Sequence, residues 1–519
     1  MKILKEKISE LWLWVQPIVF AIEIIYFWIE NPAYLLSFTH IGELFLVSFF
    51  PSLLLSIETL NNPREQDAIS GKEKAMYPKV PKEMLFNEPT GVVLGKYHRK
   101  YVCRDMKQDG HVFLIGGSGS GKSSCCAIPT LLANPHVATF AIDIKGELSF
   151  KSAKYGDEDI LIFNPQDRSK YGYDPFFSLD ENSSNQEILE TMQTITYSLI
   201  PMPASLKDPF WKNSSRNLLI GLLIYYYKDL RIDFVSVIDQ ILSKPVQDSI
   251  DQIMEKANKN SAEYRYINQF SGMAEETLGG IVAEMNNHIV IFSNDQDIRY
   301  AFKDNACKVN PHQLEEGYSI YLSIREEKLS AYYDVMQLII NQTLNELEKR
   351  PEDSKPVMVL IDELPRILSS GKIERLLDAA RTLRSRNVVL FLITQSQEAL
   401  MTAYTENEVS DLISNCAYVV VLSASSPKTQ RAVCSWCGTY MAKRQSWSGS
   451  GKDRKVSVSY EEKNIVEPKD LMVLAQTKEA IIISPWGYNR IKKVPYYEDK
   501  LLKKKSDEVI EYNKSVSGM

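Results

Sequence analysis

The chain has 519 residues, which is too long for a single hydrophobic core and predicts two or three domains. Hydrophobic residues make up 44% of it and charged residues 24%, as in ordinary globular proteins, so most of the chain should fold. A net charge of −6 gives no global signature of nucleic-acid binding, although it leaves room for a locally basic pore or groove.

Two long apolar segments stand near the N-terminus. Residues 11–29 carry Glu23 as their one charge, and residues 34–57 contain His40 and Glu43. Each segment approaches the roughly 20 residues that are needed to cross a bilayer. Because the link between them is short and three lysines precede the first, we expect a helical hairpin with both termini in the cytoplasm.

The prediction for this region is a membrane anchor of two transmembrane helices over residues 1–60, followed by a polar linker over residues 61–85. A cleaved signal peptide is disfavoured, because a second apolar segment follows and no small-residue cleavage site stands out after the first. The glutamates within both segments leave a pair of core helices, or an interfacial hairpin, as the alternative.

A glycine-rich run at residues 116–124 is the most specific motif of the chain. It matches the phosphate-loop pattern, and it follows a strand-like run at residues 111–115 and opens a helix-like run at residues 124–132. Such a loop directs backbone N–H groups at phosphate oxygens, with Lys122 on the outer phosphates and the Ser123 hydroxyl on Mg²⁺. We therefore predict ATP and Mg²⁺ as ligands, with a chance glycine-serine turn as the alternative. The predicted nucleotide-binding residues are Gly116, Gly117, Ser118, Gly119, Ser120, Gly121, Lys122, Ser123 and Ser124.

Apolar runs that alternate with helical patterns continue beyond the phosphate loop, which predicts an α/β core with a mostly parallel sheet. We assign residues 86–230 to a first part of the nucleotide-binding domain, residues 316–497 to its second part and residues 498–519 to a charged tail. The further strand-like runs lie at residues 136–142, 160–163, 319–324, 357–361, 388–393, 417–422 and 480–483.

Residues 231–315, between those two parts, show helical periodicity and almost no strand pattern. They predict an inserted all-α domain, which can either grip a polymeric substrate or serve as a packing or oligomerisation module. The helix predicted at residues 210–227 is apolar on most sides and is assigned to the core. The helices predicted within the insertion span residues 234–242, 246–257, 262–270 and 277–291.

Two carboxylates follow the strand predicted at residues 357–361. Asp362 and Glu363 would emerge at its C-terminal edge, where open α/β sheets bind ligands. In phosphate-loop ATPases such an aspartate holds Mg²⁺, and the glutamate after it can act as general base. We assign Asp362, together with Ser123, to the metal and Glu363 to the base. Taken alone, the same pattern is also a common solvated strand end.

The remaining motifs of the C-terminal half are less specific. Cys434 and Cys437 form a solitary C-x-x-C, and no second pair has the spacing of a zinc site. We therefore expect the seven cysteines to be structural thiols of a protein in a reducing cytosol. Residues 446–459 are rich in Gly, Ser and Lys and predict a loop, with non-specific contact to a phosphate backbone as the alternative.

Several motifs occur here in the combination found in one family. The chain resembles the coupling-protein ATPases of type IV secretion systems, the TraG-like conjugation coupling ATPases, over most of the part that follows the predicted anchor. The membrane hairpin and the all-α insertion fit that family too. Besides the phosphate loop, the resemblance rests on the runs Asp143-Ile-Lys-Gly-Glu147, Asp208-Pro-Phe-Trp211, Leu360-Ile-Asp-Glu-Leu-Pro365, Thr394-Gln-Ser396 and Pro468-Lys-Asp-Leu471.

The resemblance implies a RecA-like P-loop ATPase in the cell membrane of a bacterium, commonly a homo-hexamer, that uses ATP and Mg²⁺. Its implied partners are a relaxase with its bound, single-stranded DNA and the proteins of a secretion channel. Gln395 would bond the terminal phosphate or its water, and Arg384 would be the arginine finger that reaches a neighbour's nucleotide. Arg381 and Arg386 are the alternatives for that finger. The implied catalytic set is Glu363, Lys122, Gln395 and Arg384.

Two other functions stay open. One is a chromosome-segregation or DNA-packaging translocase of the FtsK/HerA-like kind, against which the run at Asp143 and the all-α insertion argue. The other is a receptor or scaffold for secreted proteins that uses nucleotide mainly as an assembly switch. The presence of Lys122, Asp362, Glu363 and Gln395 favours turnover over switching.

Overall fold

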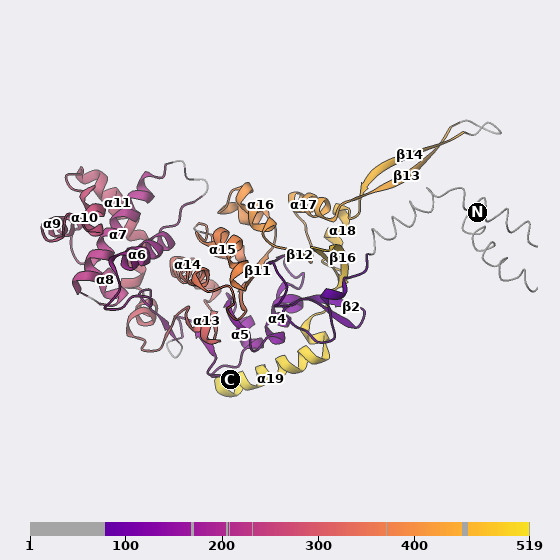
Figure 1. The fold of residues 1–519 in the computed structure, drawn as a ribbon, viewed down its shortest axis with the longest axis horizontal. Coiled ribbons are helices and arrows are strands. Elements are labelled where there is room, and N and C mark those ends of the chain that lie inside the picture. The colour runs from indigo at the N-terminus through magenta and orange to yellow at the C-terminus, as the bar shows by residue number, and fades with distance from the viewer. Residues whose placement is uncertain are drawn as a thin grey trace, which may run out of the picture. The chain divides into compact units, whose positions relative to one another are not determined.

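A computed structural model describes most of the chain after the predicted anchor (Figure 1). Within the described part, no helix combines the length and the apolar composition that crossing a bilayer requires. The transmembrane hairpin predicted at residues 1–60 lies outside the described residues, as does most of the linker predicted at residues 61–85. The described residues are 78–167, 171–203, 206, 208–230, 232–369, 371–448 and 455–517.

The described residues divide into a large body and a small two-stranded ribbon. In the ribbon, β13 (Thr439–Ser448) pairs with β14 (Lys455–Asn464) in antiparallel register. The prediction of a loop over residues 446–459 is therefore wrong at both ends, because residues 446–448 belong to β13 and residues 455–459 belong to β14. Its flanks contain β-forming residues, and the register pairs Trp447 with Val456.

The large body is built around a twelve-stranded sheet. Its parallel part confirms the predicted α/β core, and its strands are buried almost throughout, which explains why they read as continuous apolar runs. The order of the parallel strands is β12 (Tyr418–Val421), β4 (Val112–Ile115), β11 (Val388–Thr394), β10 (Val357–Ile361), β5 (Ala138–Ile142), β9 (Ser319–Leu322) and β6 (Ile160–Phe163).

Beyond β12 the sheet continues in antiparallel strands. The strand predicted at residues 480–483 is present, but it runs antiparallel to β12 rather than parallel. A tight turn joins it to the next strand, and such a turn can connect only antiparallel neighbours. From β12 outwards the order is β15 (Glu479–Ser484), β16 (Gly487–Lys492), β2 (Val92–Tyr97), β3 (Lys100–Arg104) and β1 (Leu85–Phe86).

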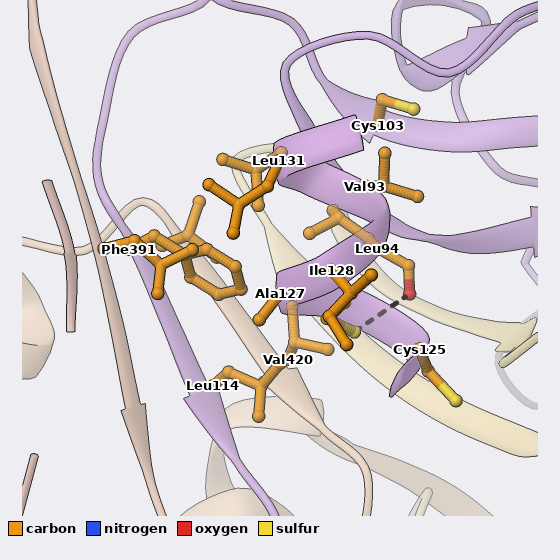
Figure 2. Packing of buried hydrophobic residues seen from close by; sticks show 14 of the residues in the cluster. Val93, Leu94, Cys103, Leu114, Cys125, Ala127, Ile128, Leu131, Phe391 and Val420 are labelled. Atoms are coloured by element: carbon orange, nitrogen blue, oxygen red, sulfur yellow. Dashed lines mark hydrogen bonds between the residues drawn. The ribbon is translucent and has the colours of Figure 1, made fainter. Parts of the chain in front are cut away.

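The helix after the phosphate loop anchors the loop in the core. It begins as a π-helical turn, η3 (Lys122–Ala127), and continues as α4 (Ile128–Ala133). One face packs on the sheet and the other is covered by β2 (Figure 2), and each large apolar side chain buried there stabilises the fold by about 1.5–3 kcal/mol. The residues of this cluster include Val93, Leu94, Leu114, Ala127, Ile128, Leu131, Phe391 and Val420.

The helical domain is larger than predicted. The buried Ser215 hydroxyl donates to the Ile281 carbonyl at 2.9 Å, and the Tyr226 and Ser249 hydroxyls lie 2.9 Å apart. The helix predicted at residues 210–227 is buried as expected, but it forms the centre of the helical domain although it lies within the range assigned to the nucleotide-binding domain, which explains why it is apolar on most sides. The domain comprises α6 (Asn185–Leu199), α7 (Phe210–Leu230), α8 (Phe234–Leu242), α9 (Val246–Lys256), α10 (Ala262–Asn268) and α11 (Glu275–Asn294).

The C-terminal segment, predicted as a charged tail, is a docked helix. Asn513 in α19 (Lys500–Ser517) donates to the carbonyls of Phe150 and Ala153, both at 2.9 Å, at the end of α5 (Glu147–Ser152). In Figure 1, α4, α5 and α19 lie on one side of the sheet. On the other side lie α14 (Tyr333–Lys349), α15 (Leu376–Thr382) and α16 (Glu406–Ser414).

Candidate active site

The carboxyl ends of three adjacent parallel strands form the candidate site. The sheet places β11 between β4 and β10, so the segments that follow these strands meet at one edge. The phosphate loop follows β4, Gln395 follows β11, and Asp362 and Glu363 follow β10. The structure therefore brings together all of the predicted site residues except Arg384.

The phosphate loop has a backbone that favours glycine at two positions. Gly119 and Gly121 have φ values of +73° and +96°, in the left-handed region that residues with a side chain rarely adopt. At Gly116 space is short as well, since a Cβ atom there would lie 2.4 Å from the Ser120 hydroxyl oxygen. Ser118 and Gly119 are exposed at the tip of the loop. The loop thus keeps its backbone accessible, as a phosphate cradle must.

Neighbouring strands hold this loop from both sides. The Gly116 N–H donates to the Thr394 carbonyl at 3.0 Å, at the end of β11. The Gly117 N–H donates to the Ser423 hydroxyl at 2.9 Å, just beyond β12. Ser124 is half-buried within the first turn of the helix. Because the ends of two strands fix the start of the loop, its donors are pre-organised before any ligand binds.

The predicted metal residues contact each other directly. The Ser123 hydroxyl donates to Asp362 Oδ2 at 3.2 Å, while Asp362 Oδ1 is buried with no hydrogen-bond partner among the described residues. Burial, and then the adjacent Glu363, raise the pKa of Asp362 to about 6. A buried carboxylate oxygen without a partner, beside a serine hydroxyl, fits Mg²⁺, which prefers oxygen ligands and would favour the ionised form.

Glu363 is the centre of the predicted catalytic group. Its φ of +56° turns the chain sharply at the end of β10, a backbone strain of about 1–3 kcal/mol for a residue with a side chain. Its Oε1 lies 3.3 Å from Lys122 Nζ, and its Oε2 accepts from Gln395 Nε2 at 3.1 Å. Lys122 Nζ also donates to the Gly117 carbonyl at 3.3 Å. The side chains of Lys122 and Glu363 are 7% and 12% exposed, so this ion pair is screened little by solvent.

Arg384 lies at the opposite edge of the sheet. It stands in the turn η7 (Leu383–Arg386) immediately before β11, whereas Gln395 follows β11. It pairs with Asp109 at 3.1 Å, and both side chains are largely exposed. A strand of this length spans roughly 20 Å. Arg384 therefore does not belong to the nucleotide site of its own chain, and the same holds for Arg381, which pairs with Asp411 at 2.7 Å.

Some residues that build the site were not assigned from the sequence. Asp143 is recognisable in the sequence only as part of a family motif. Its two carboxylate oxygens accept from the N–H groups of Leu148 and Ser149 at 3.2 and 2.7 Å, so it positions the start of α5. Burial raises the pKa of Asp143. Thr394 and Ser423, which hold the phosphate loop, can be recognised in the sequence only as polar residues at the end of apolar strand-like runs, a pattern that is not specific for a site.

Six of the seven cysteines are buried, as suits structural thiols, whereas Cys307 is exposed. Cys434 and Cys437 are buried, and burial raises the pKa of the Cys437 thiol to about 12, which disfavours the reactive thiolate. Across the described residues, no three His, Cys, Asp or Glu side chains are grouped to hold a metal ion. A Mg²⁺ ion bound by Ser123, Asp362 and nucleotide phosphates does not need such a group.

Comparisons with known proteins agree with this arrangement. The family model for type IV secretory system conjugative DNA transfer matches residues 65–518. Protein VirD4 of Agrobacterium fabrum is 20% identical over 405 residues, which cover 76% of this chain and 60% of that protein. Protein VirD4 of Rhizobium radiobacter is 21% identical over 509 residues, covering 94% of this chain and 72% of that protein. The chain thus spans about 60% of the length of the first of these relatives.

Solved structures share the fold. The bacterial conjugative coupling protein TrwBdeltaN70 superposes with a TM-score of 0.61 at 17% identity, over 82% of this chain and 91% of that one. The plasmid coupling protein TrwB in complex with ADP and Mg²⁺ has a TM-score of 0.59 at 16% identity, over 82% and 92% of the two chains. Because the family model covers nearly all of the described residues, the chain belongs to the family of type IV secretory system conjugative DNA transfer proteins.

Proposed function

We propose that the protein is an ATPase, anchored in the bacterial cell membrane, that couples relaxase-bound, single-stranded DNA to a type IV secretion channel and drives its transfer by ATP hydrolysis. The observation that carries the proposal is the contact of Glu363 with both Lys122 and Gln395, beside the Ser123–Asp362 pair. Family membership supports the DNA-transfer role, and the complex of TrwB with ADP and Mg²⁺ supports the ligands.

Each residue of this group has a role that follows from its position. The N–H groups of the phosphate loop and the Lys122 ammonium bind phosphate oxygens, and Ser123 and Asp362 hold Mg²⁺. The ion, when bound, neutralises negative charge on the phosphates. Glu363 accepts the proton of the attacking water, and Gln395, which donates to Glu363, keeps that carboxylate directed at the site. Low exposure of Lys122 and Glu363 strengthens these electrostatic effects.

The proposal includes a ring of subunits, most simply a homo-hexamer. The exposed Arg384 supports it, because this arginine is too far from its own nucleotide site to act there, and an arginine finger acts on the nucleotide of a neighbour. It also includes the membrane anchor of two transmembrane helices at residues 1–60 with both termini in the cytoplasm, which rests on the apolar segments and the preceding lysines.

The test is ATP turnover by the full-length chain, purified in detergent, with and without single-stranded DNA. The matched control is Glu363→Gln, which keeps the shape of the side chain and removes the base. We expect turnover in the unmodified chain, stimulation by single-stranded DNA, and loss of both in the control. Double-stranded DNA of the same length serves as the competitor that tests strand preference.

Two outcomes would change the proposal. Turnover that is lost in Glu363→Gln but is indifferent to DNA would retain the ATPase and contradict the DNA motor, which favours a receptor for secreted proteins. ATP binding without any turnover, the same in the unmodified chain and in the control, would contradict the catalytic assignment and indicate a nucleotide-controlled assembly switch.

A further inference from the structure

A buried lysine stands directly behind the phosphate loop. Lys493 follows β16 and is 6% exposed. Its ammonium nitrogen lies 2.7 Å from the carbonyl oxygen of Leu474, 3.3 Å from that of Ser120 and 3.5 Å from that of Leu422. These carbonyls come from three separate segments: the residue after α18 (Pro468–Val473), the phosphate loop, and the residue after β12.

The surroundings of Lys493 are unusual for a cation. An ammonium has three donors, and all three are used on backbone carbonyls. In the described part of the chain it forms no ion pair with a carboxylate, and the nearby titratable groups that affect it are the thiols of Cys125 and Cys126. Burial lowers the pKa of Lys493. Because a buried charge without a counter-ion is costly, a residue whose role was only to fill space would be apolar.

The contact with Ser120 determines how one peptide unit of the phosphate loop is oriented. The Ser120 carbonyl and the Gly121 N–H belong to the same planar peptide, and in a trans peptide these groups point in opposite directions. The described residues contain no cis peptide bond. Since the Ser120 carbonyl faces Lys493, the Gly121 N–H faces the other side of the loop. The positive charge also polarises this peptide, which favours an anion on its N–H side.

We propose that Lys493 is a positioning residue for nucleotide binding: it holds the Ser120 carbonyl so that the Gly121 N–H is directed at the phosphates of the bound nucleotide. This inference rests on the proposed function. It makes the antiparallel part of the sheet, to which β16 belongs, contribute to the phosphate site through Lys493. Lys122 contacts the phosphates directly with its ammonium group, whereas Lys493 acts on them indirectly, by orienting the peptide between Ser120 and Gly121.

The experiment measures binding of ADP with Mg²⁺ by calorimetry, and KM and kcat for ATP, on the full-length chain in detergent. Lys493→Met keeps the aliphatic stem and removes the charge, Lys493→Gln keeps a donor without charge, and Lys493→Arg keeps both. Lys492→Met is the matched control, because Lys492 is the adjacent residue and is exposed. Lys122→Ala marks the affinity without a working phosphate site. Thermal unfolding of each variant without nucleotide reports its folding.

Loss of a charged hydrogen bond predicts a rise in Kd and KM of about 10-fold or more in Lys493→Met, with kcat at saturating ATP changed less than about 3-fold. The Gln variant should lie between Met and the unmodified chain, Arg should recover most of the affinity, and Lys492→Met should not differ from the unmodified chain.

Three outcomes overturn this assignment. Folded Lys493→Met with unchanged Kd and KM would show that the contact does not affect binding. Equal rises in Met and Arg variants would show that packing, rather than the ammonium, matters. Met and Gln variants that both fail to fold would assign Lys493 a structural role. Failure of the proposed function would give a different result from failure of the Lys493 assignment, because the unmodified chain itself would then bind nucleotide no better than Lys122→Ala.

Discussion

The two edges of the central sheet differ in how they hold charge. At the carboxyl edge, Lys122 and Glu363 are almost buried and are linked to each other and to Gln395. At the amino edge, Arg384 and Asp109 form an ion pair with side chains that are 61% and 76% exposed. Strand β11 connects the two edges, since Arg384 precedes it and Gln395 follows it.

This contrast indicates which charges act within the chain and which are available to another molecule. A nearly buried ion pair interacts strongly, and breaking it changes the local structure. An exposed pair contributes about 0–1 kcal/mol, so Arg384 can exchange Asp109 for a stronger acceptor at little cost. The charges at the carboxyl edge are therefore committed to contacts within the chain, whereas Arg384 at the amino edge is exposed and available to another molecule.

The largest effect is expected at the carboxyl edge from Lys122→Ala. Removal of this ammonium leaves the outer phosphates without their side-chain cation, so nucleotide binding and turnover should fall to background. Binding of ADP with Mg²⁺ and steady-state turnover measure it, and Lys122→Arg tests whether charge alone restores activity. Turnover within tenfold of the unmodified chain would contradict the phosphate-loop assignment.

Glu363→Gln should separate binding from hydrolysis. General bases contribute about 10²- to 10⁴-fold, so kcat should fall within that range while ATP stays bound. The amide also removes the ion pair with Lys122 and keeps the shape of the side chain, so affinity for ATP should be retained or increased. Rapid filtration with labelled ATP and turnover assays measure both. Normal turnover in this variant would exclude Glu363 as the base.

A mixture of two inactive variants tests the amino edge. Arg384→Ala removes the proposed finger and Lys122→Ala removes the nucleotide site, so in the proposed ring a site works only if its own chain has Lys122 and its neighbour has Arg384. In an equimolar random ring about a quarter of the sites should therefore recover. The readout is turnover against the mixing ratio, with Arg381→Ala or Arg386→Ala as the alternative fingers. If mixtures with Arg384→Ala show no recovery but mixtures with Arg381→Ala or Arg386→Ala do, the finger would be assigned to Arg381 or Arg386 instead.

A smaller effect, on the pH dependence of stability, is expected at the amino edge from His111, which directly precedes β4. It is fully buried, its Nδ1 accepts from the Leu390 N–H at 3.1 Å, and burial lowers its pKa from 6.5 to about 4. The unfolded chain takes up the proton near pH 6.5 and the folded chain only near pH 4. Stability from this group is therefore complete above pH 6.5 and is lost as the pH falls towards 4.

At pH 5 the expected loss is about 2 kcal/mol relative to pH 7.5. His111→Asn can keep the acceptor for Leu390 and does not titrate, so its stability should change less over the same interval. Urea unfolding at the two pH values measures the difference. Equal pH dependence in both proteins would contradict the neutral, buried state of His111.

The smallest effect is expected from the ion pair at the amino edge itself. Asp109→Asn removes the partner of Arg384, yet both side chains are exposed, so the stability should change by less than about 0.5 kcal/mol. Urea unfolding at low and high salt measures it. A loss above 1 kcal/mol would show that Arg384 is held more firmly than its exposure indicates, which would weaken its assignment as a finger.

The parallel strands and the phosphate loop could be predicted from the sequence because their signals are local. A strand that is buried on both faces reads as a continuous apolar run, as in residues 357–361 and 388–393, and the phosphate loop is one contiguous motif. The carboxylates of Asp362 and Glu363 were found by their place after such a run. Arg384 was assigned by resemblance, and its role remains a prediction.

What escaped prediction depends on contacts between distant segments. Lys493 is an ordinary lysine in the sequence, and only the fold places it behind Ser120. The outer antiparallel strands are short or mixed in polarity, and β2 is interrupted at Gly95, where its register with β3 shifts. Helix α19 reads as a charged tail because few of its side chains are buried, although Asn513 bonds it firmly to the end of α5.

The order of strands in the sheet has a consequence for synthesis on the ribosome. Strand β4 lies between β11 and β12, and His111 and Leu390, which bond across β4 and β11, are 279 residues apart in the chain. Because synthesis proceeds at about 5–20 residues per second, roughly 15–60 s pass between the synthesis of β4 and that of β11, its first neighbour in the sheet. The nascent chain thus exposes an unpaired apolar strand during that time, and its capacity to bind nucleotide would appear only after β11 has left the ribosome.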